Sequence, residues 1–188
     1  TLFGVSSLGT VKLKDIDELI KTPKMFQFYF HKDRGLNDSM ISMAQEANFE
    51  ILTLTVDTIT GGNRERDLRT GFTTPPKLTP KSMFQFGIKP AWALNYLFRE
   101  KFELSQLASH VNEGTNISIS VGDYFTTMLD QSMTWDDVIK LKDNWGRKFC
   151  LKGIMSAKDA RMAVEMKADA IMVSNHGGRQ LDGGRSPF

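Results

Sequence analysis

The chain has 188 residues, enough for one domain with a hydrophobic core, and its net charge of +2 balances 24 basic against 22 acidic side chains without a basic cluster. This balance gives no indication of a nucleic-acid-binding surface. A single cysteine, Cys150, excludes an internal disulfide framework and fits a reducing compartment, and no apolar stretch is long enough to span a bilayer.

In chain order, short apolar runs predict five strands: Leu2–Ser6, Met25–Phe30, Ile51–Asp57, Phe149–Lys152 and Ala170–Ser174. Helical periodicity predicts three helices: Asp38–Asn48, a helix that begins at Thr134, and Ser156–Ala168. The last two open with a Ser or Thr followed three residues later by Asp, which is a capping-box pattern.

Strands that alternate with single helices indicate parallel βα units, which fit either a doubly wound sheet or a (β/α)8 barrel. We favour the barrel because polar side chains end several strands at once: Tyr29, Asp57, Lys152 and His176. A Rossmann sheet would carry a G-x-G-x-x-G turn, which the sequence lacks. The prediction is one partial α/β domain over 1–188, an incomplete TIM barrel with about strands 2 to 6 of eight.

The regular alternation of predicted strands and helices stops after the third predicted strand, Ile51–Asp57. Residues 58–133 are too long for a plain βα connection and are predicted to be an insertion or lid after barrel strand 4. Within it, residues 83–98 mix five aromatic side chains with aliphatic ones and one lysine, a composition that suits a membrane interface. The alternative is a lid that packs on its own barrel or on a neighbouring subunit.

The most informative segment is Ser174–Gly183, which follows the last predicted strand and reads Ser-Asn-His-Gly-Gly-Arg-Gln-Leu-Asp-Gly. His176 can accept a proton near neutral pH. Arg179 can bind a carboxylate in a bidentate manner, and glycines allow the backbone to approach a ligand closely. The segment therefore predicts chemistry on a small organic acid.

With Phe26-Gln27-Phe28-Tyr29, Leu54-Thr55-Val56-Asp57-Thr58 and Lys152-Gly153, this segment resembles the FMN-dependent L-2-hydroxy acid dehydrogenases and oxidases across the whole chain. That family includes bacterial L-lactate dehydrogenase, glycolate oxidase, flavocytochrome b2 and mandelate dehydrogenase. Two positions depart from it: Leu8 stands where plant-type glycolate oxidases carry Trp, and Ile59 replaces the Pro that usually follows Val-Asp-Thr.

The resemblance implies a role for each matching residue. The expected catalytic residues are His176 as the base, Asp57 as its carboxylate partner, and Tyr29, which is also expected to hydrogen-bond to the substrate. Arg179 and Arg64 are expected to bind the substrate carboxylate, with Arg66 as the rival to Arg64. The expected cofactor-binding residues, all toward the isoalloxazine ring of FMN, are Ser6, Gln27, Thr55 and Lys152.

Three further reactive residues, His31, His110 and Cys150, are interpreted as structural, and no metal-ligand spacing is present. The resemblance also implies that an N-terminal tyrosine and the segments that bind the FMN phosphate lie outside this sequence. We therefore expect an interior fragment of a longer enzyme, inactive by itself.

The expected reaction is oxidation of an L-2-hydroxy acid, with L-lactate as the preferred candidate, to the 2-oxo acid by a hydride or a carbanion route. The resemblance to the membrane-associated members implies that electrons pass to quinone or another acceptor. It implies a cytoplasmic enzyme that is peripheral on the cytoplasmic face of the inner membrane through 83–98, and a homotetramer. The main alternative is a soluble oxidase that produces peroxide from oxygen. A non-catalytic flavin or hydroxy-acid sensor and an FMN-dependent isomerase are disfavoured, because the His–Asp–Arg set is complete.

Overall fold

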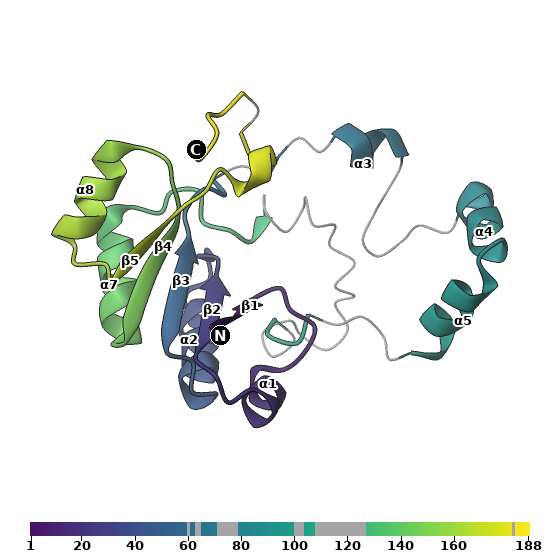
Figure 1. The fold of residues 1–188 in the computed structure, drawn as a ribbon, viewed down its shortest axis with the longest axis horizontal. Helices are drawn as coiled ribbons and strands as arrows, with labels where there is room; N and C mark the ends of the chain where they lie inside the picture. The colour runs from purple at the N-terminus through teal and green to yellow at the C-terminus, as the bar shows by residue number, and fades with distance from the viewer. Residues whose placement is uncertain (60, 63–64, 71–78, 100–103, 108–126, 182) are drawn as a thin grey trace.

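The computed structural model describes residues 1–59, 61–62, 65–70, 79–99, 104–107, 127–181 and 183–188. In this part of the chain five strands form one parallel sheet with helices packed against it (Figure 1). The strands are β1 (Phe3–Ser6), β2 (Lys24–Phe28), β3 (Ile51–Thr55), β4 (Lys148–Ile154) and β5 (Ala170–Val173). All five predicted strands are therefore confirmed, with ends that differ by at most two residues.

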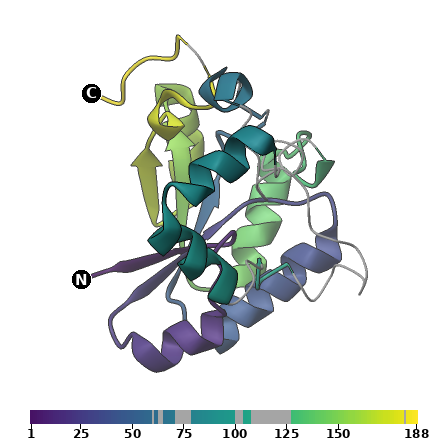
Figure 2. The ribbon, with the colours of Figure 1, turned by 90° about the vertical axis from the view of Figure 1, so that its right-hand side faces the viewer.

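The strand order follows the chain, β1-β2-β3-β4-β5, and each neighbouring pair is parallel. A doubly wound sheet reverses its order at a switch point, whereas a barrel adds each strand beside the previous one. Figure 2 shows the strand direction turning steadily from β1 to β5, as an arc of a barrel requires. The incomplete (β/α)8 barrel is confirmed.

The hydrophobic core lies between the outer face of this arc and its helices. Along β2, Phe26 and Phe28 are fully buried, whereas Met25 and Gln27, which point to the other face, are half-buried. Leu52 and Leu54 of β3 are fully buried on the same face, as are Phe149 and Leu151 of β4, although the intervening Thr53, Thr55 and Cys150 are buried as well. The outer face is thus apolar, and the inner face is left for polar side chains.

Four helices complete the βα units: α1 (Leu13–Leu19), α2 (Arg34–Glu46), α7 (Trp135–Trp145) and α8 (Ala157–Glu165). The reciprocal capping box of Thr134 and Asp137 is present at α7, and Ser156 Oγ accepts the Asp159 amide at α8. The predicted start of α2 at Asp38 is wrong. The helix begins at Arg34 because the Asp33 carboxylate accepts the Leu36 amide and caps it.

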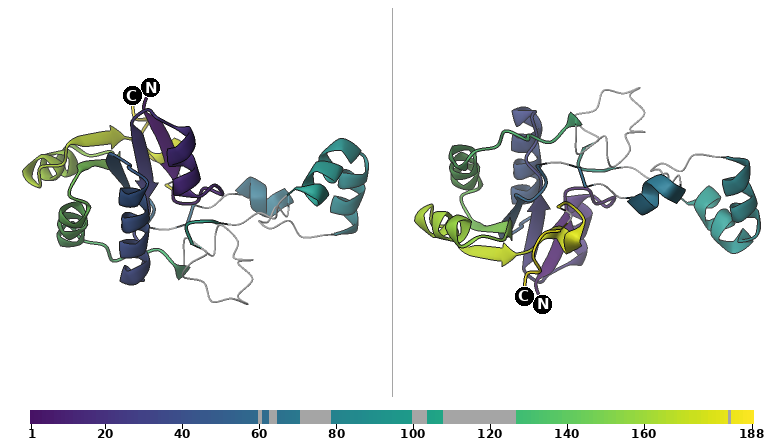
Figure 3. Two further views of the ribbon diagram at one scale, coloured as in Figure 1. Left: turned by 90° about the horizontal axis from the view of Figure 1, so that it is seen from below. Right: turned by 90° about the horizontal axis from the view of Figure 1, so that it is seen from above.

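Between β3 and β4 the described residues contain α3 (Glu65–Thr70), α4 (Pro80–Gly87) and α5 (Pro90–Phe98). Figures 1 and 3 show α4 and α5 side by side and well apart from the sheet. The chain then returns to the arc at the end of β2, where Lys32 donates its amide to Met128 and Asp130 donates its amide to Phe30. Arg34 fixes this return with an ion pair to Asp130 at 2.6 Å.

Candidate functional site

A row of polar side chains runs across the inner face of the sheet at the carboxyl ends of β1, β2 and β3. Ser6 Oγ donates to Gln27 Oε1 at 2.9 Å, and Gln27 Nε2 donates to Thr55 Oγ1 at 2.7 Å. The three side chains come from adjacent strands, and Ser6 and Gln27 are register partners. Three predicted cofactor-binding residues are therefore joined in one hydrogen-bonded row.

Lys152 continues the row on β4, where its register partner is Thr55. Its side chain is half-buried. In the part of the chain that the structure describes, no ion pair or hydrogen bond of the Lys152 ammonium group occurs. A partly buried cation without a carboxylate partner is suited to receive an anionic ligand.

His176 and Asp57 meet at the same edge of the sheet. His176 Nδ1 lies 2.9 Å from Asp57 Oδ1, and the two side chains are 19% and 13% exposed. The second carboxylate oxygen, Asp57 Oδ2, is buried and has no hydrogen-bond partner within the described ranges. This pairing orients the imidazole ring through its Nδ1 atom.

The backbone around His176 is held in an uncommon conformation. His176 has a φ of 60°, in the left-handed region, and is the first residue of a short 3₁₀ helix, His176–Gly178. Its amide donates to Ser174 Oγ, and the Gly178 amide donates to Asn175 Oδ1. Left-handed backbone at a bulky residue costs about 1–3 kcal/mol and often accompanies a functional constraint.

Arg179 follows this turn and is exposed. The loop after β3 reaches it through Gly62, where a Cβ atom would overlap the Arg179 carbonyl. Arg64, the second residue predicted to bind a carboxylate, lies outside the described residues. Its rival Arg66 is exposed on α3.

Tyr29 is buried directly after β2.

His31, two residues further along the chain, is fully buried, and its Nδ1 lies 3.0 Å from Asn37 Oδ1. Burial lowers the pKa of His31 to about 4, so that the ring is neutral at physiological pH. Cys150 is a buried thiol whose pKa is raised by burial. His31 and Cys150 thus have the surroundings of structural residues; His110 lies outside the described residues.

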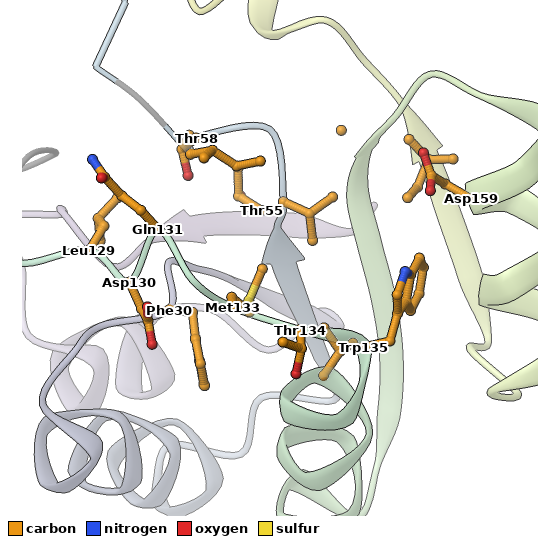
Figure 4. Close-up of a pocket in the computed structure, with 15 residues that line it drawn as sticks. Phe30, Thr55, Thr58, Leu129, Asp130, Gln131, Met133, Thr134, Trp135 and Asp159 are labelled. Carbon is orange, nitrogen blue, oxygen red and sulfur yellow. The ribbon is translucent and has the colours of Figure 1, made fainter.

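A cavity of about 250 Å³ lies beside the carboxyl ends of β3 and β4, against the start of α7 (Figure 4). Its lining mixes apolar side chains such as Phe30, Met133 and Trp135 with polar ones such as Thr58 and Asp130. His176, Lys152 and Arg179 do not line it. Thr55 of the polar row contributes to the lining, so the cavity adjoins the row, whereas neither His176 nor Asp57 lines it.

The projecting helices α4 and α5 carry much exposed apolar surface. Phe84, Leu97 and Phe98 are 71%, 72% and 84% exposed. Phe86 stacks on Trp92, and Trp92 stacks on Tyr96, with ring centroids 5.1 and 5.4 Å apart. Within the described residues, no helix has the combination of length and hydrophobicity needed to cross a membrane.

Comparison with known proteins places these features in a family. The family model described as FMN-dependent dehydrogenase matches residues 1–188. An L-lactate dehydrogenase of Pseudomonas syringae is 36% identical over 94% of this chain, and one of Vibrio parahaemolyticus is 34% identical over 96%. The chain covers 47% and 48% of these two proteins, so it spans about half the length of such relatives.

Solved structures of a 2-hydroxy acid dehydrogenase and of an oxidase also match nearly the whole of this chain. The monotopic membrane protein (S)-mandelate dehydrogenase matches 99% of this chain with a TM-score of 0.85 at 29% identity, and 49% of its own chain is covered. A lactate oxidase of Pediococcus acidilactici matches all of this chain with a TM-score of 0.69 at 28% identity, and 42% of its chain is covered.

Proposed function

Because the chain belongs to the FMN-dependent dehydrogenase family, we propose that the protein containing it oxidises an L-2-hydroxy acid, with L-lactate as substrate, to the 2-oxo acid. The observation that carries this proposal is the His176–Asp57 pair at the strand ends beside Lys152 and the polar row. The L-lactate dehydrogenase relatives support the choice of substrate.

The residues present fit FMN. The inner face offers Ser6, Gln27 and Thr55 as hydrogen-bonding partners for a planar ring with alternating donors and acceptors. Lys152 adds a cation that lacks a carboxylate partner among the described residues. We assign these four side chains to the flavin ring, where Lys152 would stabilise negative charge on the reduced form.

Bound FMN would supply the acceptor for the two electrons that leave the substrate carbon. With Nδ1 engaged by Asp57, the Nε2 atom of neutral His176 is the nitrogen that takes the hydroxyl proton. The Asp57 carboxylate then stabilises the imidazolium. Arg179, together with Arg64, would hold the substrate carboxylate, and Tyr29 would hydrogen-bond to the substrate.

The test is anaerobic mixing of the intact, FMN-loaded protein with L-lactate, D-lactate or propionate. We expect L-lactate alone to bleach the flavin, because propionate lacks the hydroxyl group and D-lactate presents its hydrogen to the wrong side. Flavin that stays oxidised with L-lactate and with other L-2-hydroxy acids would overturn the proposal.

For the electron acceptor, we propose quinone reached at a membrane surface through residues 83–98, within the insertion or lid formed by 58–133. The exposed apolar side chains of α4 and α5 support this, as does the similarity to a monotopic membrane protein. The second candidate, oxygen reduction by a soluble oxidase, is supported by the similarity to a lactate oxidase. The cytoplasmic location and the homotetramer remain predictions; light scattering of the intact protein measures the latter.

Sedimentation with anionic lipid vesicles separates the two acceptor proposals. We expect the intact protein to bind vesicles and to reduce a quinone analogue faster than oxygen. The combined substitutions Phe84→Ser, Leu97→Ser and Phe98→Ser should abolish vesicle binding. Val164→Ser on α8, where the side chain is 75% exposed, is the matched control and should leave it intact. Peroxide formation without vesicle binding would favour the oxidase.

A further inference from the structure

Gly153 occupies a special position in β4, directly after Lys152. Its φ is 107°, in a region that side-chain-bearing residues rarely adopt. The pairing of β4 with β5 is irregular at this point, between Lys152 and Ile154. The local backbone therefore depends on glycine.

The absence of a side chain also makes room for Asp57. A Cβ atom on Gly153 would lie 2.7 Å from both Cβ and Cγ of Asp57 and 3.0 Å from its backbone nitrogen. These atoms have little freedom to move away, because the Val56 amide donates to the Lys152 carbonyl at 2.8 Å and fixes the two strands against each other. Any side chain at 153 would have to displace the Asp57 side chain.

The Asp57 carboxylate has few other constraints. Its Oδ1 atom is 2.9 Å from His176 Nδ1, and its Oδ2 atom has no hydrogen-bond partner in the described part of the chain. Packing against Gly153 thus adds a steric constraint to the one hydrogen bond that holds the carboxylate. We propose that Gly153 is a positioning residue that acts through Asp57 to hold His176 in its orientation. The catalytic consequence rests on the proposed function, whereas the geometric consequence does not.

The test is Gly153→Ala in the intact flavoprotein, read out first by its crystal structure. We expect the distance from His176 Nδ1 to Asp57 Oδ1 to exceed the hydrogen-bonding limit of about 3.5 Å. A distance that stays near 2.9 Å would overturn the inference whatever the activity. If the wild-type protein oxidises no 2-hydroxy acid, the proposed function fails while this measurement still decides the role of Gly153.

The kinetic readout is a double-mutant cycle with Asp57→Asn. We expect Gly153→Ala to slow flavin reduction at least about tenfold in the wild-type background but less than about threefold in the Asp57→Asn background, because the pair is already broken there. Equal losses in both backgrounds would indicate a general structural effect and overturn the inference. Affinity for the 2-oxo acid product should change little, since Gly153 has no part in carboxylate binding.

Gly146→Ala is the matched control. Gly146 also has a positive φ, 65°, but a Cβ atom there would meet nothing closer than 3.9 Å. This variant should lower the melting temperature without altering the rate of flavin reduction. If Gly153→Ala is not recovered in soluble form, Gly153→Ala combined with Asp57→Gly removes the two carbon atoms in conflict. Recovery of soluble protein supports the inference. Recovery no better than that of Gly153→Ala would show that backbone strain at 153, and not the contact with Asp57, decides the outcome, and would contradict the inference.

Discussion

His176 Nδ1 lies 2.9 Å from Asp57 Oδ1, although 119 residues separate them in the chain. The parallel arc brings them together, because Asp57 follows β3, His176 follows β5, and the carboxyl ends of β3, β4 and β5 lie at one edge. Four predictions concern this pair and the polar side chains near it, and a fifth concerns the buried His31.

Asp57→Asn removes the charge while keeping the size of the side chain. We expect kcat for L-lactate to fall by about 10²–10⁴-fold, because an amide stabilises the imidazolium poorly, and KM to change little. Steady-state kinetics of the intact protein measure this. Asp136→Asn, the same change at an exposed position of α7, should have no effect. Unchanged kcat in Asp57→Asn would remove this carboxylate from the mechanism.

Arg179→Gln should raise KM for L-lactate about ten- to hundredfold, because a charge-assisted hydrogen bond to the carboxylate is lost. Lactamide, which lacks the carboxylate charge, should be oxidised equally poorly by wild type and variant. Arg161→Gln on the exposed side of α8 provides the control. An unaltered KM in Arg179→Gln would assign carboxylate binding to other residues.

Lys152→Met should slow flavin reduction about a hundredfold and make the reduction potential of bound FMN more negative, because the reduced flavin loses a nearby positive charge. Stopped-flow absorbance and redox titration measure the two effects. Lys158→Met, at an exposed position of α8, should change neither. A potential equal to that of wild type would place Lys152 away from the flavin.

The sequence could predict which polar residues meet at the strand ends, because the signals are local: the structure joins Ser6, Gln27 and Thr55 in one row. It also pairs His176 with Asp57, while the roles of these residues stay predictions. The start of α2 was missed because Asp33 caps it from a run, His31-Lys32-Asp33-Arg34, that has no apolar periodicity. The contact between Gly153 and Asp57 was missed for another reason. It depends on the register of β3 and β4 and on the φ of one residue, neither of which a pattern of residue types encodes.

The buried His31 predicts a pH dependence of stability. Its pKa is about 4 in the folded protein and near 6.5 when unfolded, so the unfolded state binds more protons between these values. The contribution of His31 to stability is therefore fully present above pH 6.5 and is lost as the pH falls toward 4. Over this range the free energy of unfolding decreases by on the order of 3 kcal/mol.

His31→Gln should flatten this part of the profile. Urea unfolding at several pH values between 4 and 7 measures the free energy of unfolding of wild type and variant. Because both proteins carry the same carboxylates, the difference between the two profiles isolates the contribution of His31. Parallel profiles for the two proteins would show that His31 is not the group responsible.

In the proposed reaction His176 removes the hydroxyl proton of an L-2-hydroxy acid. Anaerobic stopped-flow reduction of the bound flavin by L-lactate in the intact His176→Gln protein isolates this step. We expect a rate constant at least about 10²-fold below that of wild type, with FMN still bound. Flavin reduction at the wild-type rate in this variant would show that His176 is not the base.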